Sequence, residues 1–320
     1  MRYKFKQREM KAIVLTEAGQ VDKLVLTTLP APIIVKDEVL IQVKAIGINP
    51  VDAKTRSGKG LYGKLKEQPP VILGWDVSGI VTESKSQLFK VGDEVFGMVN
   101  FPGHGKAYAE YVAAPATQLA LKPANISHEE AAAATLAALT AWQALVSHAK
   151  IKATDRILIH AAAGGVGHYA VQIARHIGAY IVGTSSAKNK DFVMELGADE
   201  HIDYTSQRFE DATEALDFVL DTIGGDNIDR SLEVIKTGGT IISIPSGLNE
   251  QVTAKASAKG INGYFILVES NGDDMKQLAG LLEKGIVKSH VGQTYPFEQL
   301  PAAHSAIESG RTVGKIVITV

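Results

Sequence analysis

The alternation of hydrophobic and polar positions divides the chain into two regions of different character. Between Lys11 and about Pro123, short apolar and β-branched runs are separated by turn residues, and no strong helical period appears. The strands predicted in this region are Ala12–Leu15, Glu38–Ala45, Gly79–Thr82, Glu94–Met98 and Ala109–Ala113. This pattern predicts a compact, mostly β domain.

From about Ser127 the pattern changes to strands and helices in strict alternation, which is typical of βαβ units and a parallel sheet. The predicted helices are Glu129–His148, Val166–Ile177, Asn189–Leu196, Asn227–Ile235, Asp273–Glu283 and Gln299–Glu308. The predicted strands are Arg156–Ala161, Tyr180–Thr184, His201–Asp203, Asp217–Leu220, Thr240–Ile244, Gly263–Val268 and Lys315–Thr319. The predicted fold class is therefore α/β, with a doubly wound parallel sheet inserted into the β domain.

We expect the β domain to comprise residues 1–125 and 262–320, with the parallel-sheet domain at residues 126–261 between them. Residues 1–9 form a basic stretch before the first predicted strand. We expect this stretch to be a flexible, solvated tail, although a basic stretch can also contact a polyanion.

A glycine-rich turn joins the first strand of the parallel-sheet domain to the helix that follows it, within the run Ile157–Ala170. Gly164 would let the backbone approach a pyrophosphate, and Gly167 would let the helix pack closely on the strand. Ala162 occupies the place where the first glycine of G-x-G-x-x-G usually stands. By itself the turn is weak evidence, because any tight strand-to-helix connection can look similar.

The segment Gly183–Lys190 stands where an acidic residue would bind the ribose of NAD. It carries Ser185, Ser186, Lys188 and Lys190 and no carboxylate. Hydroxyl and ammonium groups donate to a 2′-phosphate, whereas a carboxylate repels it. The segment therefore predicts NADPH as the cofactor; the alternative is an ordinary exposed helix start, with Ser186 as its cap and the lysines solvated.

Composition narrows the classes of partner. The 320 residues are 45% hydrophobic, and 33 basic residues balance 35 acidic ones, so there is no electrostatic footprint for nucleic acid or an anionic membrane. No apolar run approaches the roughly 20 residues of a membrane span, and we expect a cytoplasmic protein that acts on small molecules. The absence of cysteine excludes disulfides, cysteine nucleophiles and thiolate metal sites.

Further motifs extend this pattern over essentially the whole chain after Met10. They are Gly47–Asp52, Leu73–Gly79, Val91–Gly97, Leu139–Leu145 and Gly314–Val317. In this order and spacing they resemble the zinc-independent quinone oxidoreductases of the medium-chain dehydrogenase/reductase superfamily. The resemblance implies a GroES-like catalytic domain, a Rossmann domain, a nicotinamide in the cleft between them and a homodimer.

The resemblance also implies roles for individual residues. Those matching the pyrophosphate turn are Ala162, Gly164, Gly165, Val166 and Gly167, and those matching the 2′-phosphate site are Ser185 and Lys190, with Ser186 beside them. Tyr204 matches a tyrosine flanking the adenosine phosphate, Thr140 a threonine near the nicotinamide, and the strand Phe265, Ile266, Leu267 the backbone that holds the carboxamide. The alternative for Tyr204 and Thr140 is that they bind no cofactor and lie at the edge of the core, with their hydroxyls hydrogen-bonded within the protein.

Zinc-dependent members of the superfamily bind the catalytic metal through Cys, His and Cys. This chain has Asn49, Trp75 and approximately Leu136 at those positions. Tryptophan and leucine cannot ligate Zn²⁺, and a single amide oxygen is a poor ligand for it. We therefore predict no metal site.

Without a Lewis acid, a hydride can still be transferred to an acceptor that is already electrophilic. Asn49 could hydrogen-bond the acceptor carbonyl or simply cap the following turn, and Lys54 could stabilise a developing anion or lie solvated. We expect Arg56 to be solvated. Trp75 could wall the pocket or belong to the core, and Tyr62 is a candidate proton donor.

The leading hypothesis is an NADPH-dependent reductase of quinones. The second is reduction of the double bond of enones or alkenals. The third, from another class, is a redox-silent NADPH-binding structural or RNA-associated protein, to which the near-neutral charge gives little support.

Overall fold

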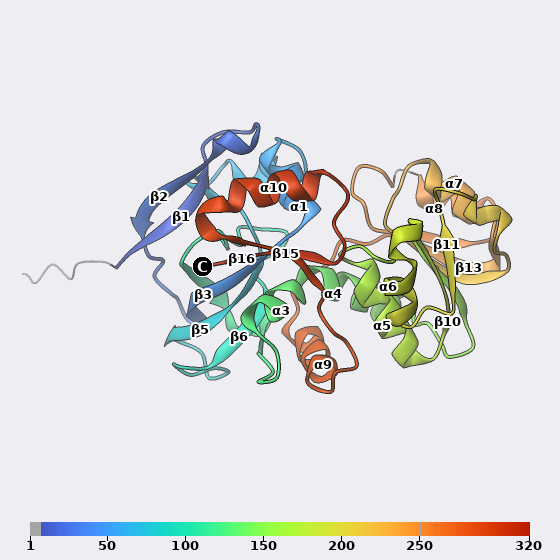
Figure 1. Cartoon of the computed structure of the whole chain (residues 1–320). Helices are drawn as coiled ribbons and strands as arrows, with labels where there is room; N and C mark the ends of the chain where they lie inside the picture. Colours follow the sequence, from blue (N-terminus) through green and yellow to red (C-terminus); the bar gives the residue numbers. More distant parts are fainter. Residues whose placement is uncertain (1–7, 250) are drawn as a thin grey trace, which may run out of the picture. The chain divides into compact units, whose positions relative to one another are not determined.

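The computed structural model describes residues 8–249 and 251–320, so most of the predicted tail at residues 1–9 lies outside the described residues. The chain forms two compact units (Figure 1). The first contains the residues up to Leu136 together with Glu269–Glu283 and Ser289–Val320, and the second contains Ala137–Val268 and Lys284–Lys288.

The first unit is built on antiparallel sheets. A seven-stranded sheet has the order β15-β16-β3-β5-β6-β8, with β7 also paired to β3, and a three-stranded sheet has the order β2-β1-β4. The strands are β1 Glu9–Leu15, β2 Leu24–Pro30, β3 Glu38–Ile48, β4 Val71–Ile72, β5 Asp76–Ser84, β6 Glu94–Met98, β7 Tyr111–Pro115, β8 Leu119–Leu121, β15 Val291–Pro296 and β16 Lys315–Thr319. Only β15 and β16 pair in parallel among these strands as described.

The helices of the first unit are short, apart from two near the C-terminus. They are α1 Pro50–Arg56, α2 Tyr62–Leu65, α3 His128–Ala133, α9 Gly272–Glu283 and α10 Leu300–Glu308, with 3-10 turns at Val21–Lys23, Ala116–Gln118 and Phe297–Gln299. Helix α3 belongs to this unit because Ala132 and Ala133 pack with Ala45 and Val317 of the sheet. For that reason the compact units divide at Leu136 and not at residue 125.

The second unit is a parallel six-stranded sheet with the order β11-β10-β9-β12-β13-β14. In chain order this is 3-2-1-4-5-6, the order of a Rossmann sheet. The strands are β9 Arg156–Ile159, β10 Tyr180–Ser185, β11 Glu200–Asp203, β12 Leu216–Asp221, β13 Ile235–Ser243 and β14 Asn262–Phe265. The helices are α4 Leu136–Trp142, α5 Gly167–Ile177, α6 Lys190–Glu195, α7 Asp226–Leu232 and α8 Val252–Ser257, with a π-helix at Gln143–His148 and 3-10 turns at Ala187–Asn189 and Phe209–Asp211.

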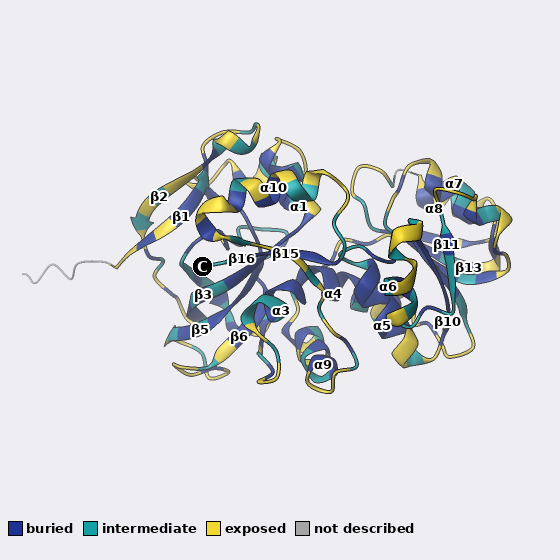
Figure 2. Cartoon of the chain, in the orientation of Figure 1, coloured by how far each residue is buried: buried dark blue, intermediate teal, exposed yellow. Residues whose placement is uncertain are grey.

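The central strands carry the apolar cores, and most of β3 and β16 appears in the buried colour in Figure 2. In the second unit the central strands contribute Leu158, Val182, Val219 and Ile241, each fully buried. A strand covered on both faces reads as a continuous apolar run, and this explains why the βαβ alternation was visible in the sequence. The predicted α/β class, with a doubly wound parallel sheet and a mostly β region, is confirmed.

Several predicted elements differ from the structure. The predicted helix Glu129–His148 is divided into α3, α4 and the π-helix, with the Thr135 hydroxyl donating to the Ala132 carbonyl at the first break. Helix α7 ends at Leu232, because Ile235 already begins β13. No helix was predicted before Pro123, yet α1 forms there; its 7 residues are too few to show a helical period.

Among the described residues, no helix is long and apolar enough to cross a membrane.

Candidate functional site

The turn between β9 and α5 has the close backbone approaches that its glycines suggested. Strand β9 ends at Ile159 and not at Ala161, because Ala161 adopts a left-handed conformation with φ of 47°. The Gly164 amide donates to the Ala161 carbonyl at 2.8 Å. A Cβ placed on Gly167 would lie 2.2 Å from the Ala161 oxygen, so this position admits only glycine. Helix α5 begins directly after this turn, and its His168 and Ala170 amides donate to the Gly164 and Val166 carbonyls at 3.1 and 3.0 Å.

The turn is held from the neighbouring strand and from within α5. The Ala162 amide donates to the Thr184 carbonyl at 2.8 Å, and the Ala161 amide donates to the Thr184 hydroxyl at 3.2 Å. A ring nitrogen of His168 lies 2.9 Å from the Gly164 carbonyl. Ala162 is fully buried. The backbone of the turn is therefore ordered before any ligand arrives.

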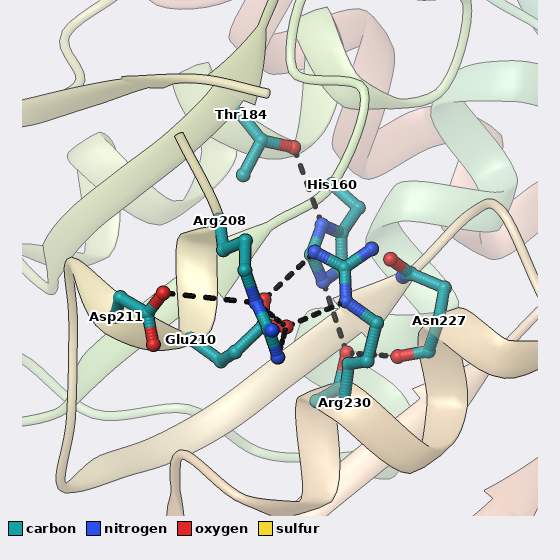
Figure 3. A network of polar contacts seen from close by, with 8 residues as sticks. His160, Thr184, Arg208, Glu210, Asp211, Asn227 and Arg230 are labelled. Carbon is teal, nitrogen blue, oxygen red and sulfur yellow. Dashed lines mark hydrogen bonds and ion pairs between the residues drawn. The ribbon is translucent and has the colours of Figure 1, made fainter. Parts of the chain in front are cut away.

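A buried polar network continues from this turn, and Figure 3 shows it from close by. His160 Nδ1 lies 3.2 Å from the Thr184 hydroxyl, and Nε2 lies 3.0 Å from the Ser231 hydroxyl, which itself donates to the Asn227 carbonyl. The ring packs edge-on against Phe209, with centroids 4.6 Å apart. Burial lowers the pKa of His160 to about 4, so the ring is neutral at pH 7.

Charged residues lie next to this network, and Figure 3 shows Arg208, Glu210 and Arg230 among them. The Arg230 guanidinium lies 4.6 Å from the centroid of the Phe209 ring. Arg230 donates to both oxygens of Glu210 at 2.8 and 2.7 Å, and Arg208 donates to the same carboxylate at 2.9 Å. The hydrogen bonds from Arg230 are the largest cause that lowers the pKa of Glu210 to about 2. Sequence analysis missed this network, and its only signal was a histidine directly after a buried strand.

The residues predicted to meet a 2′-phosphate gather at the carboxyl end of β10. Ser185 ends that strand, Lys190 begins α6 and is exposed, and the Tyr204 amide donates to the Ser185 carbonyl at 3.3 Å. Ser186 precedes the 3-10 turn but makes no side-chain capping hydrogen bond, which weakens the alternative of a simple helix cap. Tyr204 is 62% exposed, so a ligand can reach it.

Two neighbours of Ser185 were missed by sequence analysis. The Ser185 hydroxyl lies 2.8 Å from Nε2 of His201 on the adjacent strand β11. Asp203 pairs with Ser185 in the sheet register, but its carboxylate accepts from the Ala187 amide and from the amide and hydroxyl of Thr205. The only sequence signal for these two neighbours was that His201 and Asp203 lie in a short predicted strand.

The remaining cofactor candidates lie on α4 and at the end of β14. Thr140 is on α4 and is 5% exposed. Phe265 ends β14 and pairs with Ser243, whereas Ile266 and Leu267 follow the strand. The prediction that Phe265 to Leu267 form a strand is therefore wrong for its last two residues, because the pairing with β13 stops at Ser243.

In the first unit the side chain and the backbone amide of Asn49 are hydrogen-bonded to neighbouring residues. Its side-chain amide donates to Asp76 at 2.7 Å, and its side-chain oxygen accepts from the Lys315 ammonium. Its backbone amide donates to the Asp52 carboxylate at 2.7 Å, one half of a capping box at the start of α1. Asn49 is 2% exposed. This geometry favours the structural alternative over hydrogen bonding to an acceptor.

The groups around Asn49 form a buried charge cluster. Lys315 also donates to the Ile48 carbonyl at 3.0 Å and lies 3.8 Å from Asp76, which accepts from the Leu136 amide. Burial raises the pKa of Asp76 and lowers that of Lys315, and it raises the pKa of Asp52 to about 8. Sequence analysis quoted Asp52, Asp76 and Lys315 within motifs but assigned them no role.

Trp75 is a core residue and presents no face to solvent. It is fully buried, its indole N–H donates to the Gly103 carbonyl at 2.7 Å, and its ring packs edge-on against Phe101. The hypothesis of Trp75 as a pocket wall is therefore not supported, because its ring is enclosed by its own unit.

The cationic and hydroxyl candidates on α1 and α2 differ in their exposure. Arg56 is 1% exposed and donates to the Gly19 carbonyl and the Glu308 carboxylate, so the prediction of a solvated Arg56 is wrong. Lys54 and Tyr62 are partly exposed. The Tyr62 hydroxyl accepts from the Ala18 amide at 3.2 Å. Lys54 and Tyr62 thus remain as side chains that a ligand can reach.

No group of three or more His, Asp or Glu residues that could hold a metal ion occurs in residues 8–249 and 251–320. At the positions matching the catalytic ligands of zinc-dependent relatives, Trp75 and Leu136 are buried and the Asn49 oxygen is already bound to Lys315. This donor set does not fit Zn²⁺.

Comparison with known proteins gives consistent matches. Residues 196–318 match the family described as zinc-binding dehydrogenase, and residues 35–124 match the alcohol dehydrogenase GroES-like domain. The 2-methylene-furan-3-one reductase of Solanum lycopersicum is 36% identical over 97% of this chain and 79% of its own. The chloroplastic NADPH-dependent alkenal/one oxidoreductase of Arabidopsis thaliana is 36% identical over 97% and 80%. The structure of the quinone oxidoreductase from Coxiella burnetii shares 36% identity and a TM-score of 0.93, covering 98% of this chain and 100% of that one.

Proposed function

Because the chain belongs to the medium-chain dehydrogenase/reductase superfamily and is quinone oxidoreductase-like, we propose that this NAD(P)H oxidoreductase uses NADPH to reduce a quinone. The observation that carries the choice of cofactor is the carboxyl end of β10. There Ser185, Ser186 and Lys190 stand without a carboxylate on that strand end, and the nearby Asp203 carboxylate accepts from the Ala187 amide and the Thr205 hydroxyl.

The residues of the second unit fit the cofactor. The turn at Ala162, Gly164, Gly165, Val166 and Gly167 offers backbone amides and the N-terminus of α5 to the pyrophosphate. Ser185, Ser186 and Lys190 would hold the 2′-phosphate, with Tyr204 flanking the adenosine. Thr140 and the backbone of Phe265, Ile266 and Leu267 would orient the nicotinamide. When bound, NADPH supplies the hydride.

The choice of quinone over other acceptors rests on protonation. A hydroquinone anion takes its proton from solvent, whereas the enolate formed from an enone needs a proton delivered to carbon. In the first unit Asn49 and Trp75 are buried, whereas Lys54 and Tyr62 are partly exposed and are therefore the polar candidates. Lys54 would stabilise the developing oxyanion.

Reduction of enones or alkenals is the second candidate. Two relatives at 36% identity carry names that describe reductases of this kind. In that reaction Tyr62, whose oxygen already accepts from the Ala18 amide, would direct its own proton toward the substrate.

The test is oxidation of NADPH and of NADH against ortho-quinones, para-quinones and alkenals side by side. We expect turnover with quinones and a preference for NADPH. Turnover with alkenals alone would establish the second candidate in its place. NADPH binding with no oxidation by any acceptor would overturn both and support a redox-silent role.

The proposal includes a cytoplasmic homodimer. Light scattering on the purified protein tests the assembly, and a monomer at micromolar concentration would contradict it.

A further inference from the structure

The imidazole of His201 lies beside the hydroxyl that the proposed function assigns to the 2′-phosphate. His201 is on β11, and β11 pairs in parallel with β10, placing Gly183 opposite His201 and Ser185 opposite Asp203. Its Nε2 is 2.8 Å from the Ser185 hydroxyl oxygen. The same hydroxyl donates to the Ser186 carbonyl at 3.2 Å. Ser185 is 3% exposed, so its hydroxyl has few directions open to it.

The Ser185 hydroxyl carries one proton. Which group accepts that proton depends on whether Nε2 of His201 is protonated. If Nε2 bears no proton, the Ser185 hydroxyl donates to the ring. An approaching anion then faces the lone pairs of the Ser185 oxygen. If Nε2 is protonated, the ring donates to Ser185. The serine proton, which the Ser186 carbonyl accepts in the unliganded protein, then turns to a phosphate oxygen when the cofactor binds. The second arrangement attracts a 2′-phosphate, while the first repels it.

We propose that His201 is a specificity-determining residue for the phosphorylated cofactor, since its Nε2–H directs the Ser185 hydroxyl proton toward the adenosine 2′-phosphate. This inference rests on the proposed use of NADPH. As an imidazolium, His201 also adds a positive charge close to that phosphate. NADH carries no phosphate at this position, so His201 distinguishes the two cofactors.

The polar groups around His201 come from three elements, and two of these groups are charged. Helix α6 contributes the Lys190 ammonium, β11 contributes the Asp203 carboxylate, and β10 contributes the neutral Ser185 hydroxyl. Burial is the main cause that lowers the pKa of His201 in the unliganded protein; Asp203 raises it and Lys190 lowers it further. A bound phosphate favours the protonated ring and raises this pKa.

The sign of the pH dependence follows from this linkage. A ligand that prefers the protonated ring binds more tightly as the pH falls through the pKa of the bound state. Its affinity becomes constant below the pKa of the free state. NADPH affinity therefore increases on acidification across the histidine range, and NADH affinity does not.

The experiment is calorimetric titration of the full chain with NADPH and with NADH between about pH 6 and pH 8.5. The variants are His201→Leu, which removes the ring donor, and His201→Gln, which keeps an amide donor without the charge. His176→Gln is the matched control, because His176 lies in the exposed last turn of α5. The 2′-phosphate of NADPH also titrates, but it does so equally for the parent and every variant. Its effect therefore cancels when their pH profiles are compared.

We expect His201→Leu to lower NADPH affinity by about tenfold at the acid end, and to leave NADH affinity within about twofold. His201→Gln is intermediate, and its NADPH affinity lacks the additional increase at low pH. The control behaves as the parent. Equal loss of NADPH and NADH affinity would overturn the inference, as would a parent-like NADPH pH profile in His201→Gln.

Failure of the underlying proposal gives a different result. If the parent protein binds NADH as tightly as NADPH over the whole pH range, the proposed cofactor is wrong. If the parent prefers NADPH and His201→Leu keeps that preference, only the role of His201 is wrong.

Discussion

The Lys315 ammonium donates to the side-chain oxygen of Asn49, and this contact joins residues that are 266 positions apart in the chain. It links β16 to the start of α1, inside the first unit. Asp76 completes the cluster by accepting from the Asn49 amide. Asn49, which matches the position of a catalytic zinc ligand in the zinc-dependent dehydrogenases, therefore belongs to a buried charge cluster in this protein.

We expect Lys315→Met to destabilise the protein by about 3 to 5 kcal/mol, because it leaves the buried Asp76 carboxylate without its cation. Chemical denaturation measures this free energy of unfolding. The double variant with Asp76→Asn should lose less than the sum of the single variants. Lys90→Met, at an exposed position, is the control. Strictly additive losses would contradict the coupling.

Gly167→Ala should destabilise by about 1 to 3 kcal/mol, because its Cβ would meet the Ala161 oxygen at 2.2 Å. It should also weaken NADPH binding, since the shift occurs in the turn itself. Gly280→Ala is the matched control: a Cβ there meets nothing within 4 Å in helix α9, and alanine favours a helix. Thermal melting and calorimetric titration give both values. Parent-like binding by Gly167→Ala would argue against the turn as the pyrophosphate site.

Replacing Ser185 with Asp and Lys190 with Ala should shift the cofactor preference from NADPH toward NADH. The carboxylate repels the 2′-phosphate, and the loss of Lys190 alone removes one charge-assisted hydrogen bond, about tenfold in affinity. The ratio of kcat/KM for the two cofactors is the measurement. Lys284→Ala, at an exposed position of the same unit, should keep the parent ratio. An unchanged ratio in the double variant would remove the basis for choosing NADPH.

The buried His160 should make the protein sensitive to acid. Its pKa is about 4 in the folded state, below the ordinary value of about 6.5, so the unfolded chain takes up a proton first as the pH falls. The associated stability is complete above about pH 6.5 and is lost between there and about pH 4.

His160→Gln should be less stable than the parent at pH 7 by about 1 to 2 kcal/mol, with a gap that narrows toward pH 4.5. Denaturation curves at a series of pH values measure this gap. His176→Gln, on the surface, should show no such convergence. A constant gap across the range would mean that His160 does not titrate in this window.

The β9–turn–α5 segment could be predicted from the sequence because its determinants are local. Glycine spacing and a short apolar run act within about ten residues, where side-chain periodicity and backbone freedom decide the conformation. Ala161 shows the limit of this reasoning: it reads as the last residue of a strand, yet it turns at positive φ because the Gly164 amide bonds to its carbonyl.

Asn49 and Arg56 show why the roles of side chains were harder to predict from the sequence than the local backbone structure. The sequence left Asn49 as either a partner of the acceptor carbonyl or a turn cap, and it favoured a solvated Arg56. The burial of each depends on partners far along the chain, Lys315 for Asn49 and Glu308 for Arg56. The burial of a polar side chain is decided by which distant group pairs with it, and one sequence holds no record of that pairing.

By itself the sequence determined the alternating βαβ order, the glycine turn, the lack of cysteine ligands and the hydroxyl and ammonium groups after β10, because each depends on residue type and short-range spacing. Only the tertiary structure decided that Trp75 is core, that Asn49 is held by Asp76 and Lys315, and that His201 meets Ser185. Those relationships arise when sheet register brings separate strands together, and register is a property of the packed molecule.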